Sequence, residues 1–293
     1  MSLRAKIVGA VIRRSMKKRL ASFNDADEVR GLTNTPSSAP PSDIGVQAVD
    51  AAGVAAEWIE SRDAKTHKVI LYLHGGGYVF GGLDSHREIA WRLAKQTGQR
   101  VLLLDYRLAP EHQFPAPVDD AYAAYCWLLG EGYSAENLIV AGDSAGGGLA
   151  IALALKLKDE GVQLASALVL MSPWADLTLS GATIDANDAS DVMLSRGALQ
   201  RFADIYLGDQ DAAHPYASPL FGDLSGLPRT YVIVGDGEVL RSDSDRLAKG
   251  IEAAGGEISL KVWPGMMHVF PVAARLIPEG RQAIQDIGHF IES

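Results

Sequence analysis

Runs of apolar residues alternate with amphipathic segments along most of the chain, and this alternation predicts its secondary structure. Five predominantly apolar runs indicate strands buried on both faces: residues 68–73, 100–106, 138–141, 167–171 and 231–235. Between and after them, apolar positions recur at helical spacing in residues 85–96, 118–129, 149–158, 242–254 and 279–291. This alternation predicts an α/β fold with a mostly parallel, doubly wound central sheet and helices on both faces.

The ends of the predicted sheet carry two further features. Residues 45–49 and 54–59 read as strands joined by a turn, so we expect a hairpin that opens an otherwise parallel sheet. Residues 258–263 read as the last strand. An exposed terminal strand can pair with another chain through its edge, so a homodimer formed through this strand is an expectation.

The chain before the hairpin has a different character. Apolar residues recur about every fourth position from residue 3 to residue 20, with bases on the other face, which predicts an amphipathic helix. It has two interpretations: a helix laid over the body of the protein, or a basic helix on an anionic membrane surface. Residues 31–43 are rich in proline and serine and predict a linker.

The alternation breaks between residues 176 and 227, a stretch too long for an ordinary loop. We expect a helical insertion that lies over the active site. The predicted domain organisation is therefore an N-terminal cap segment and linker at residues 1–43, followed by a catalytic domain at residues 44–293 that contains the insertion.

Composition narrows the classes of function. The 293 residues include 27 basic and 36 acidic side chains, and the net charge of −9 argues against nucleic acid as the partner. Residues 1–20 carry seven bases and no acid. The single cysteine cannot form an internal disulfide, and no segment approaches the roughly 20 apolar residues of a transmembrane helix. With no signal peptide recognised either, we expect a cytoplasmic protein.

The strongest chemical signal lies where the apolar run at residues 138–141 passes into helical sequence. Ser144 stands there between Gly142 and Gly146, in the pattern Gly-x-Ser-x-Gly. A sharp strand-to-helix turn would bring side chains two positions before and after the serine into collision, which explains the glycines. This nucleophile elbow is a motif of the α/β-hydrolases, and it lifts the serine hydroxyl above the sheet.

A serine nucleophile needs a base and a carboxylate that orients it. Of the seven histidines, His268 alone occupies a loop immediately after a predicted C-terminal strand, where a parallel sheet presents functional groups. Asp236, Glu238 and Asp243 follow the strand at residues 231–235. Asp243 is expected in the first turn of a helix, where a carboxylate needs no catalytic explanation. Spacing does not choose between Asp236 and Glu238.

Four blocks in this order resemble the hormone-sensitive-lipase-like branch of the α/β-hydrolases, a group of bacterial carboxylesterases. They are His-Gly-Gly-Gly at 74–77, Asp-Tyr-Arg-Leu-Ala-Pro-Glu at 105–111 with Phe-Pro-Ala at 114–116, Gly-Asp-Ser-Ala-Gly at 142–146 and Gly-Met-Met-His-Val-Phe at 265–270. In that family the acid is usually an aspartate thirty residues before the histidine. Glu238 holds that position here, so the resemblance selects it, with glutamate in place of aspartate.

The resemblance also implies roles for neighbouring residues. It assigns the oxyanion hole to the backbone N–H groups of Gly75, Gly76 and Ala145, whereas His74 and Asp143 are expected to brace the site without reacting. The insertion and the N-terminal segment would form the family's cap, which shapes the acyl pocket and limits water. This favours the interpretation of the leading helix as a cover for the body.

The sequence therefore predicts a serine carboxylesterase that hydrolyses short-chain esters through an acyl-enzyme. No dinucleotide fingerprint, phosphate loop, zinc-protease motif or cysteine cluster is present, so no cofactor or metal is expected. Two alternatives stay open. One is a non-catalytic small-ligand receptor on the same fold, although the related receptors lose the histidine that this chain keeps. The other is a hydrolase of amides or long-chain lipids.

Overall fold

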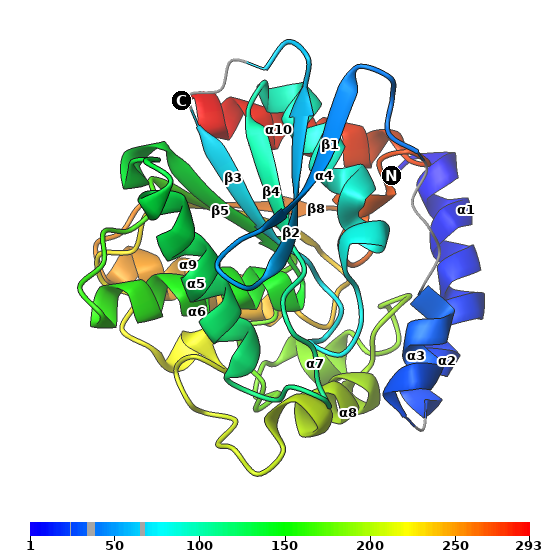
Figure 1. Ribbon diagram of the computed structural model, residues 1–293. Helices are drawn as coiled ribbons and strands as arrows, with labels where there is room; N and C mark the ends of the chain where they lie inside the picture. Colours follow the sequence, from blue (N-terminus) through cyan, green and yellow to red (C-terminus); the bar gives the residue numbers. More distant parts are fainter. Residues whose placement is uncertain (24, 34–38, 65–67) are drawn as a thin grey trace.

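Helices cover both faces of one central sheet in the computed structural model, which describes residues 1–23, 25–33, 39–64 and 68–293 (Figure 1). Within these residues eight strands pair in the order β1-β2-β4-β3-β5-β6-β7-β8. The strands are β1 (Ile44–Asp50), β2 (Ala55–Ser61), β3 (Val69–Leu73), β4 (Arg100–Leu104), β5 (Leu138–Asp143), β6 (Ala167–Met171), β7 (Arg229–Gly235) and β8 (Ile258–Trp263). The hairpin β1–β2 is antiparallel and so is its junction with β4, whereas all pairs from β4 to β8 are parallel. The predicted fold class is confirmed.

Four of the predicted helical segments in the body have their ends within two residues of the observed ones, and the helix after Ser144 begins four residues earlier than predicted. The helices are α1 (Leu3–Ile12), a π-helical turn (Arg13–Lys17), α2 (Lys18–Ser22), α3 (Ala26–Thr33), α4 (Leu83–Thr97), α5 (Ala116–Gly130), α6 (Ala145–Asp159), α7 (Thr183–Ala186), α8 (Arg196–Leu207), α9 (Arg241–Ala253) and α10 (Pro278–Glu292). Short 3₁₀ turns occur at Ala135–Asn137, Pro219–Phe221 and Phe270–Ala273.

The predicted linker at residues 31–43 is only partly correct. Its first three residues are the end of helix α3, which the sequence analysis did not predict, and residues 34–38 lie outside the described residues. Asp27 and Glu28 lie in the first turn of α3, where negative charge opposes the helix dipole favourably. These two acidic residues are a sign of a helix start, but the proline- and serine-rich stretch that follows favours a linker over a helix.

The two faces of the sheet pack into separate hydrophobic layers. In β3, Val69, Leu71 and Leu73 face a core that includes side chains of α5, α6 and α9. Ile70 and Tyr72 point the other way, into a core built with α4 and α10. All five side chains are fully buried, and burying one large apolar side chain stabilises the fold by about 1.5–3 kcal/mol. The central strands therefore read as continuous apolar runs, because neither face meets water.

The parallel strands bring their carboxyl ends to one edge of the sheet. Asp143 at the end of β5 pairs with Met171 at the end of β6, and Gly235 of β7 pairs with Trp263 of β8. The segments that follow these strands therefore start side by side. They are the segments in which the sequence placed its candidate nucleophile, acid and base.

The N-terminal helices lie against the inserted segment. Figure 1 shows α1 along one edge of the molecule, with α2 and α3 at its lower end beside α8. Phe23 stacks on Phe202 of α8, with ring centroids 5.0 Å apart. Arg13 donates to the backbone oxygens of Ala189 and Ser190 at 3.0 and 2.8 Å. Among the described residues no helix is long and apolar enough to cross a membrane.

Candidate active site

The turn between β5 and α6 carries Ser144 in a strained backbone conformation. Its φ is 52° and its ψ is −121°, a left-handed region that non-glycine residues seldom occupy. A Cβ atom at Gly142 would lie 2.2 Å from the backbone oxygen of Gly146, so the first glycine is required by the turn itself. A Cβ at Gly146 would instead lie 2.0 Å from the oxygen of Leu73. The second glycine is thus needed for packing against β3, which differs from the predicted collision between side chains.

Ser144, His268 and Glu238 form a continuous hydrogen-bonded chain. The Oγ atom of Ser144 lies 2.9 Å from Nε2 of His268, and Nδ1 of the same imidazole lies 2.8 Å from Oε2 of Glu238. His268 and Glu238 are 3% and 1% exposed. Because a carboxylate only accepts hydrogen bonds, Nδ1 carries the proton and Nε2 is free to accept from the serine.

The alternative acid candidates lie elsewhere. Asp236 is exposed, and its carboxylate accepts from the backbone N–H of Gly265 at 2.7 Å, which braces the loop that leads to the histidine. Asp243 is buried in the first turn of α9 and contacts the backbone of residues 175 and 176. The geometry thus brings together the three residues selected by the resemblance and leaves Asp236 and Asp243 outside.

Ser172 completes the surroundings of Glu238 and was missed by the sequence analysis. Its hydroxyl donates to Oε1 of Glu238 at 2.8 Å and accepts from the backbone N–H of Val269 at 3.2 Å. It therefore links the acid to the loop of the histidine. Ser172 is the first residue after β6 and has a φ of 51°, so its position at a strand end was the available signal.

The glycine loop after β3 differs from expectation at one donor. The backbone N–H of Gly75 donates to Oδ1 of Asp143 at 3.1 Å, so this donor is already occupied. The N–H groups of Gly76, Gly77 and Ala145 have no hydrogen-bond acceptor among the described residues. Gly76 and Gly77 have φ values of 127° and 59°, which a β-carbon would strain. Three free N–H groups therefore remain near Ser144.

His74 and Asp143 are buried and contact the backbone of the glycine loop at Gly75. The imidazole of His74 stacks on Tyr106 with centroids 4.1 Å apart, and burial lowers the pKa of His74 to about 3, so the ring is neutral near pH 7. Asp143 accepts from the hydroxyl of Tyr72 at 2.8 Å and lies 3.4 Å from Nε2 of His86. Burial alone would raise the pKa of Asp143, but these two partners outweigh it and lower the pKa. The bracing role of His74 and Asp143 stays a prediction.

A cavity of about 190 Å³ opens beside Ser144 and His268. Its polar wall includes the glycine loop. Its apolar wall comes from the N-terminal segment and the insertion, with Met16, Leu20, Met193, Leu194, Leu199 and Phe202. Residues from both predicted cap segments thus border the same space as the serine.

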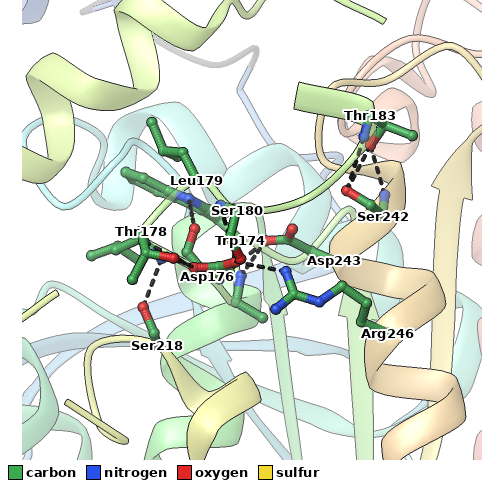
Figure 2. Close-up of polar contacts among 12 residues, drawn as sticks. Trp174, Asp176, Thr178, Leu179, Ser180, Thr183, Ser218, Ser242, Asp243 and Arg246 are labelled. Carbon is green, nitrogen blue, oxygen red and sulfur yellow. Dashed lines mark hydrogen bonds and ion pairs between the residues drawn. The ribbon is translucent and has the colours of Figure 1, made fainter. Parts of the chain in front are cut away.

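A buried polar cluster anchors the start of the inserted segment to α9 (Figure 2). Oδ2 of Asp243 accepts from the backbone N–H groups of Ala175 and Asp176 at 3.0 and 3.1 Å. Asp176 accepts from Arg246 at 2.6 Å and from its own turn at Thr178. The other oxygen of Asp243 has no partner among the described residues. Burial raises the pKa of Asp243 to about 7, so the cluster gains a buried charge as the pH rises through that value.

Asp243→Asn is expected to make the free energy of unfolding less sensitive to pH. The carboxyl has a pKa of about 7 in the native state and about 3.9 when unfolded, so between these values the native state binds more protons and its stability falls as pH rises. Asparagine keeps an oxygen for both N–H groups and cannot ionise. Urea titrations at pH 5 and pH 8 should show a relative gain of roughly 2–4 kcal/mol for the variant at pH 8.

The matched control for this substitution is Glu252→Gln, an exposed position on the same helix α9. It removes one charge from the surface and should shift the stability equally at both pH values. A pH dependence in Asp243→Asn equal to that of the wild type would contradict the assignment of the titration to Asp243.

Comparison with known proteins places the chain in a family. A family model described as an alpha/beta hydrolase fold matches residues 70–272. The chain belongs to this α/β hydrolase family. Within the described residues no group of three or more His, Cys, Asp or Glu side chains is arranged to hold a metal ion.

Curated relatives of this α/β hydrolase are named as an acetyl-hydrolase and as esterases. An acetyl-hydrolase of Streptomyces hygroscopicus is 41% identical over 95% of this chain and 90% of its own. An esterase of Acinetobacter venetianus is 38% identical over 85% of this chain and 82% of its own. The match to the acetyl-hydrolase spans 95% of the 293 residues, so it includes part of the N-terminal segment as well as the catalytic body.

Solved structures agree with these relatives. An esterase from the bacterial hormone-sensitive lipase family has a TM-score of 0.93 and 40% identity, covering 99% of this chain and 98% of its own. EstE5 soaked with p-nitrophenyl butyrate has a TM-score of 0.95 and 38% identity, with the same coverage. The predicted membership in the hormone-sensitive-lipase-like group is confirmed.

Proposed function

We propose that this α/β hydrolase is a serine carboxylesterase that hydrolyses short-chain carboxylic esters through an acyl-enzyme. The observation that carries the proposal is the hydrogen-bonded chain from Ser144 through His268 to Glu238, beside a small cavity. The esterase names of relatives about 40% identical over nearly the whole chain support the same reaction.

In the proposed mechanism His268 Nε2 takes the proton of Ser144 while Oγ attacks the ester carbonyl. Glu238 stabilises the imidazolium that forms, since its carboxylate lies 2.8 Å from Nδ1. The imidazolium then gives its proton to the departing alcohol, which leaves the acyl group on Ser144. Water activated by His268 repeats these steps and releases the acid.

We propose Gly76, Gly77 and Ala145 as the donors to the oxyanion. Their N–H groups have no acceptor among the described residues, and Ala145 opens the helix α6, whose N-terminal dipole favours negative charge. Gly75 would first have to give up its bond to Asp143, so it is replaced in this proposal by Gly77. Loss of one such donor typically lowers the rate about 100- to 1,000-fold.

The two segments at residues 1–43 and 176–227 are proposed as a cap that limits acyl-chain length. The cavity of about 190 Å³ is smaller than the roughly 300–1,000 Å³ of pockets that hold drug-sized ligands. The aromatic pair Phe23 and Phe202 joins the two segments beside this space. A short acyl group fits such a cavity better than a long one.

A chain-length series tests this function. We expect kcat/KM for p-nitrophenyl esters to be highest between acetate and hexanoate and to fall at least about tenfold for octanoate and further for palmitate, because each excess methylene finds no room. Phe202→Ala is expected to move the optimum toward longer chains. An optimum at palmitate, or preferred hydrolysis of an anilide, would instead favour a long-chain lipase or an amidase.

The pH profile of kcat/KM tests the role of His268. Burial lowers the pKa of this imidazole, but the hydrogen bond and charge of Glu238 raise it more, so the pKa lies above 6.5. Only the neutral ring accepts the serine proton, so activity falls as pH drops below the pKa. We expect a rate at pH 5 at least about 30-fold below the plateau. A flat profile from pH 5 to 8 would contradict the assignment.

An oligomeric state and a cellular location are proposed as well. Strand β8 lies at the edge of the sheet, and pairing of two copies through it would form a homodimer, which size-exclusion chromatography tests. A cytoplasmic location is supported by the free thiol of Cys126 and can be checked by cell fractionation.

A further inference from the structure

Helix α1 is apolar on two opposite faces, and only one of them is covered. Ala5 and Gly9 are buried against the body of the protein. Leu3, Ile7 and Val11 follow at intervals of four residues, so they lie together on the other side, where they are 72%, 56% and 60% exposed. With Met1, they make up four of the seven large apolar side chains that are exposed among the described residues.

A helix with apolar residues all round normally has both faces covered. Single exposed apolar residues are common on protein surfaces, but contiguous exposed stripes mark contact sites. Figure 1 shows α1 on the outer rim of the molecule, with no other element outside it. The outer stripe of Leu3, Ile7 and Val11 therefore indicates a contact site for a partner.

Cationic side chains surround this stripe. Five of them are exposed and form no hydrogen bond or ion pair with any described residue: Arg4, Lys6, Arg14, Lys18 and Arg19. Two other bases of the segment, Arg13 and Lys17, are used internally, since they bind backbone oxygens of the inserted segment. Residues 1–20 contain no acid, whereas the whole chain has a net charge of −9.

We propose that α1 and the following basic turns dock on an anionic lipid surface, with Leu3, Ile7 and Val11 inserted among the headgroups and the free cations near the phosphates. Interfacial helices have this combination of an apolar stripe and flanking Lys and Arg. A second copy of the chain is a poorer partner, because a symmetric contact would bring two strongly basic segments together. Docking needs no ester hydrolysis, so it stands apart from the proposed function.

The docked face lies over a second cavity. A space of about 430 Å³ is lined by Ala5, Gly9 and Ala10 of α1 and by the loops of Glu238 and His268. The helix therefore borders this cavity as well as packing on the body. An anionic surface that binds the outer face would hold this cavity, and the site behind it, next to the lipid.

Vesicle sedimentation of the full chain tests the proposal. The wild type is expected to bind vesicles of equal parts phosphatidylglycerol and phosphatidylcholine at low salt, and to remain in the supernatant with phosphatidylcholine alone. The triple variant Arg4→Glu, Arg14→Glu, Lys18→Glu should lower the partition coefficient about 100-fold or more, since each cation near an anionic surface contributes about fivefold. Glutamate is a good helix former, so the helix is kept.

The matched control reverses three exposed cations elsewhere, in Arg62→Glu, Lys249→Glu, Arg275→Glu. It changes the net charge by the same amount, and its binding should fall far less than that of the α1 variant. Equal losses in both triple variants would overturn the proposal, because binding would then follow net charge and not the helix face.

The apolar stripe is tested by Leu3→Gln, Ile7→Gln, Val11→Gln, which should also weaken vesicle binding at least about tenfold. Circular dichroism and thermal unfolding show whether each variant keeps the native fold. Failure of the folded wild type to bind anionic vesicles would overturn the proposal. So would a wild-type dimer that this variant converts to a monomer, since the stripe would then be a contact between copies.

Discussion

Ser144→Ala is expected to lose ester hydrolysis almost completely while it keeps the native fold. Removal of the nucleophile in a serine hydrolase lowers kcat by about 10⁶-fold, and only hydrolysis assisted by the oxyanion donors remains. Alanine carries the same Cβ as serine, so the strain at a φ of 52° is unchanged. Initial rates with p-nitrophenyl butyrate, together with thermal unfolding of both proteins, measure the effect.

Ser134→Ala is the matched control, because it removes one hydroxyl from an exposed position before β5, whereas Ser144 follows the other end of that strand. It should hydrolyse p-nitrophenyl butyrate at the wild-type rate. Retention of activity in Ser144→Ala would remove the basis of the proposed mechanism. A folded wild type that hydrolyses no ester of any chain length would favour a ligand receptor, and binding measurements would replace kinetics.

The second large effect is expected at the acid. Glu238→Gln should lower kcat/KM by about 10⁴-fold, since the amide no longer stabilises the imidazolium and can hold the ring in the wrong tautomer. It should also move the acid limb of the pH profile to lower pH, because the carboxylate is what raises the pKa of His268. Steady-state kinetics from pH 5 to 9 record both changes.

Two neighbouring substitutions sharpen this test. Glu238→Asp keeps the charge but shortens the side chain by one methylene, so we expect an intermediate loss. Asp236→Asn should stay within about threefold of the wild type, because Asp236 contacts the backbone of Gly265 and not the imidazole. A larger loss in Asp236→Asn than in Glu238→Gln would mean that the acid is wrongly assigned.

The sequence predicted the body of the fold well, for a physical reason. Strands buried on both faces must be apolar throughout, so β6 was bounded to the residue and the other central strands to within two residues. The edge strand β8 was also bounded to the residue, although it is only partly buried. Helix α3 was missed, because it is short and runs directly into a proline- and serine-rich stretch. The π-helical turn after α1 leaves the periodicity nearly unchanged and was not predicted.

At the candidate site, the sequence pointed to residues that lie together in the structure where a residue type and its neighbours indicate a chemistry, and it missed contacts between residues far apart in the sequence. Ser144 and His268 are marked by their neighbours and by strand ends. The choice of Glu238 over Asp236 needed the resemblance, since both follow β7 closely. Ser172 contacts an acid 66 positions away, so its place at a strand end marks the residue but not its partner. The occupation of the Gly75 N–H by Asp143 likewise depends on how β3 and β5 lie side by side.

The order of the strands also fixes when the site is completed during protein synthesis. From β3 through β5 to β8 the sheet grows outward to one edge, so the nucleophile lies near its centre and the histidine follows its last strand. A nascent chain that has emerged as far as α9 holds the serine and the glutamate but not His268. The ribosome must therefore synthesise nearly the whole polypeptide before His268 can activate the serine. An incomplete chain is expected to have no hydrolytic activity.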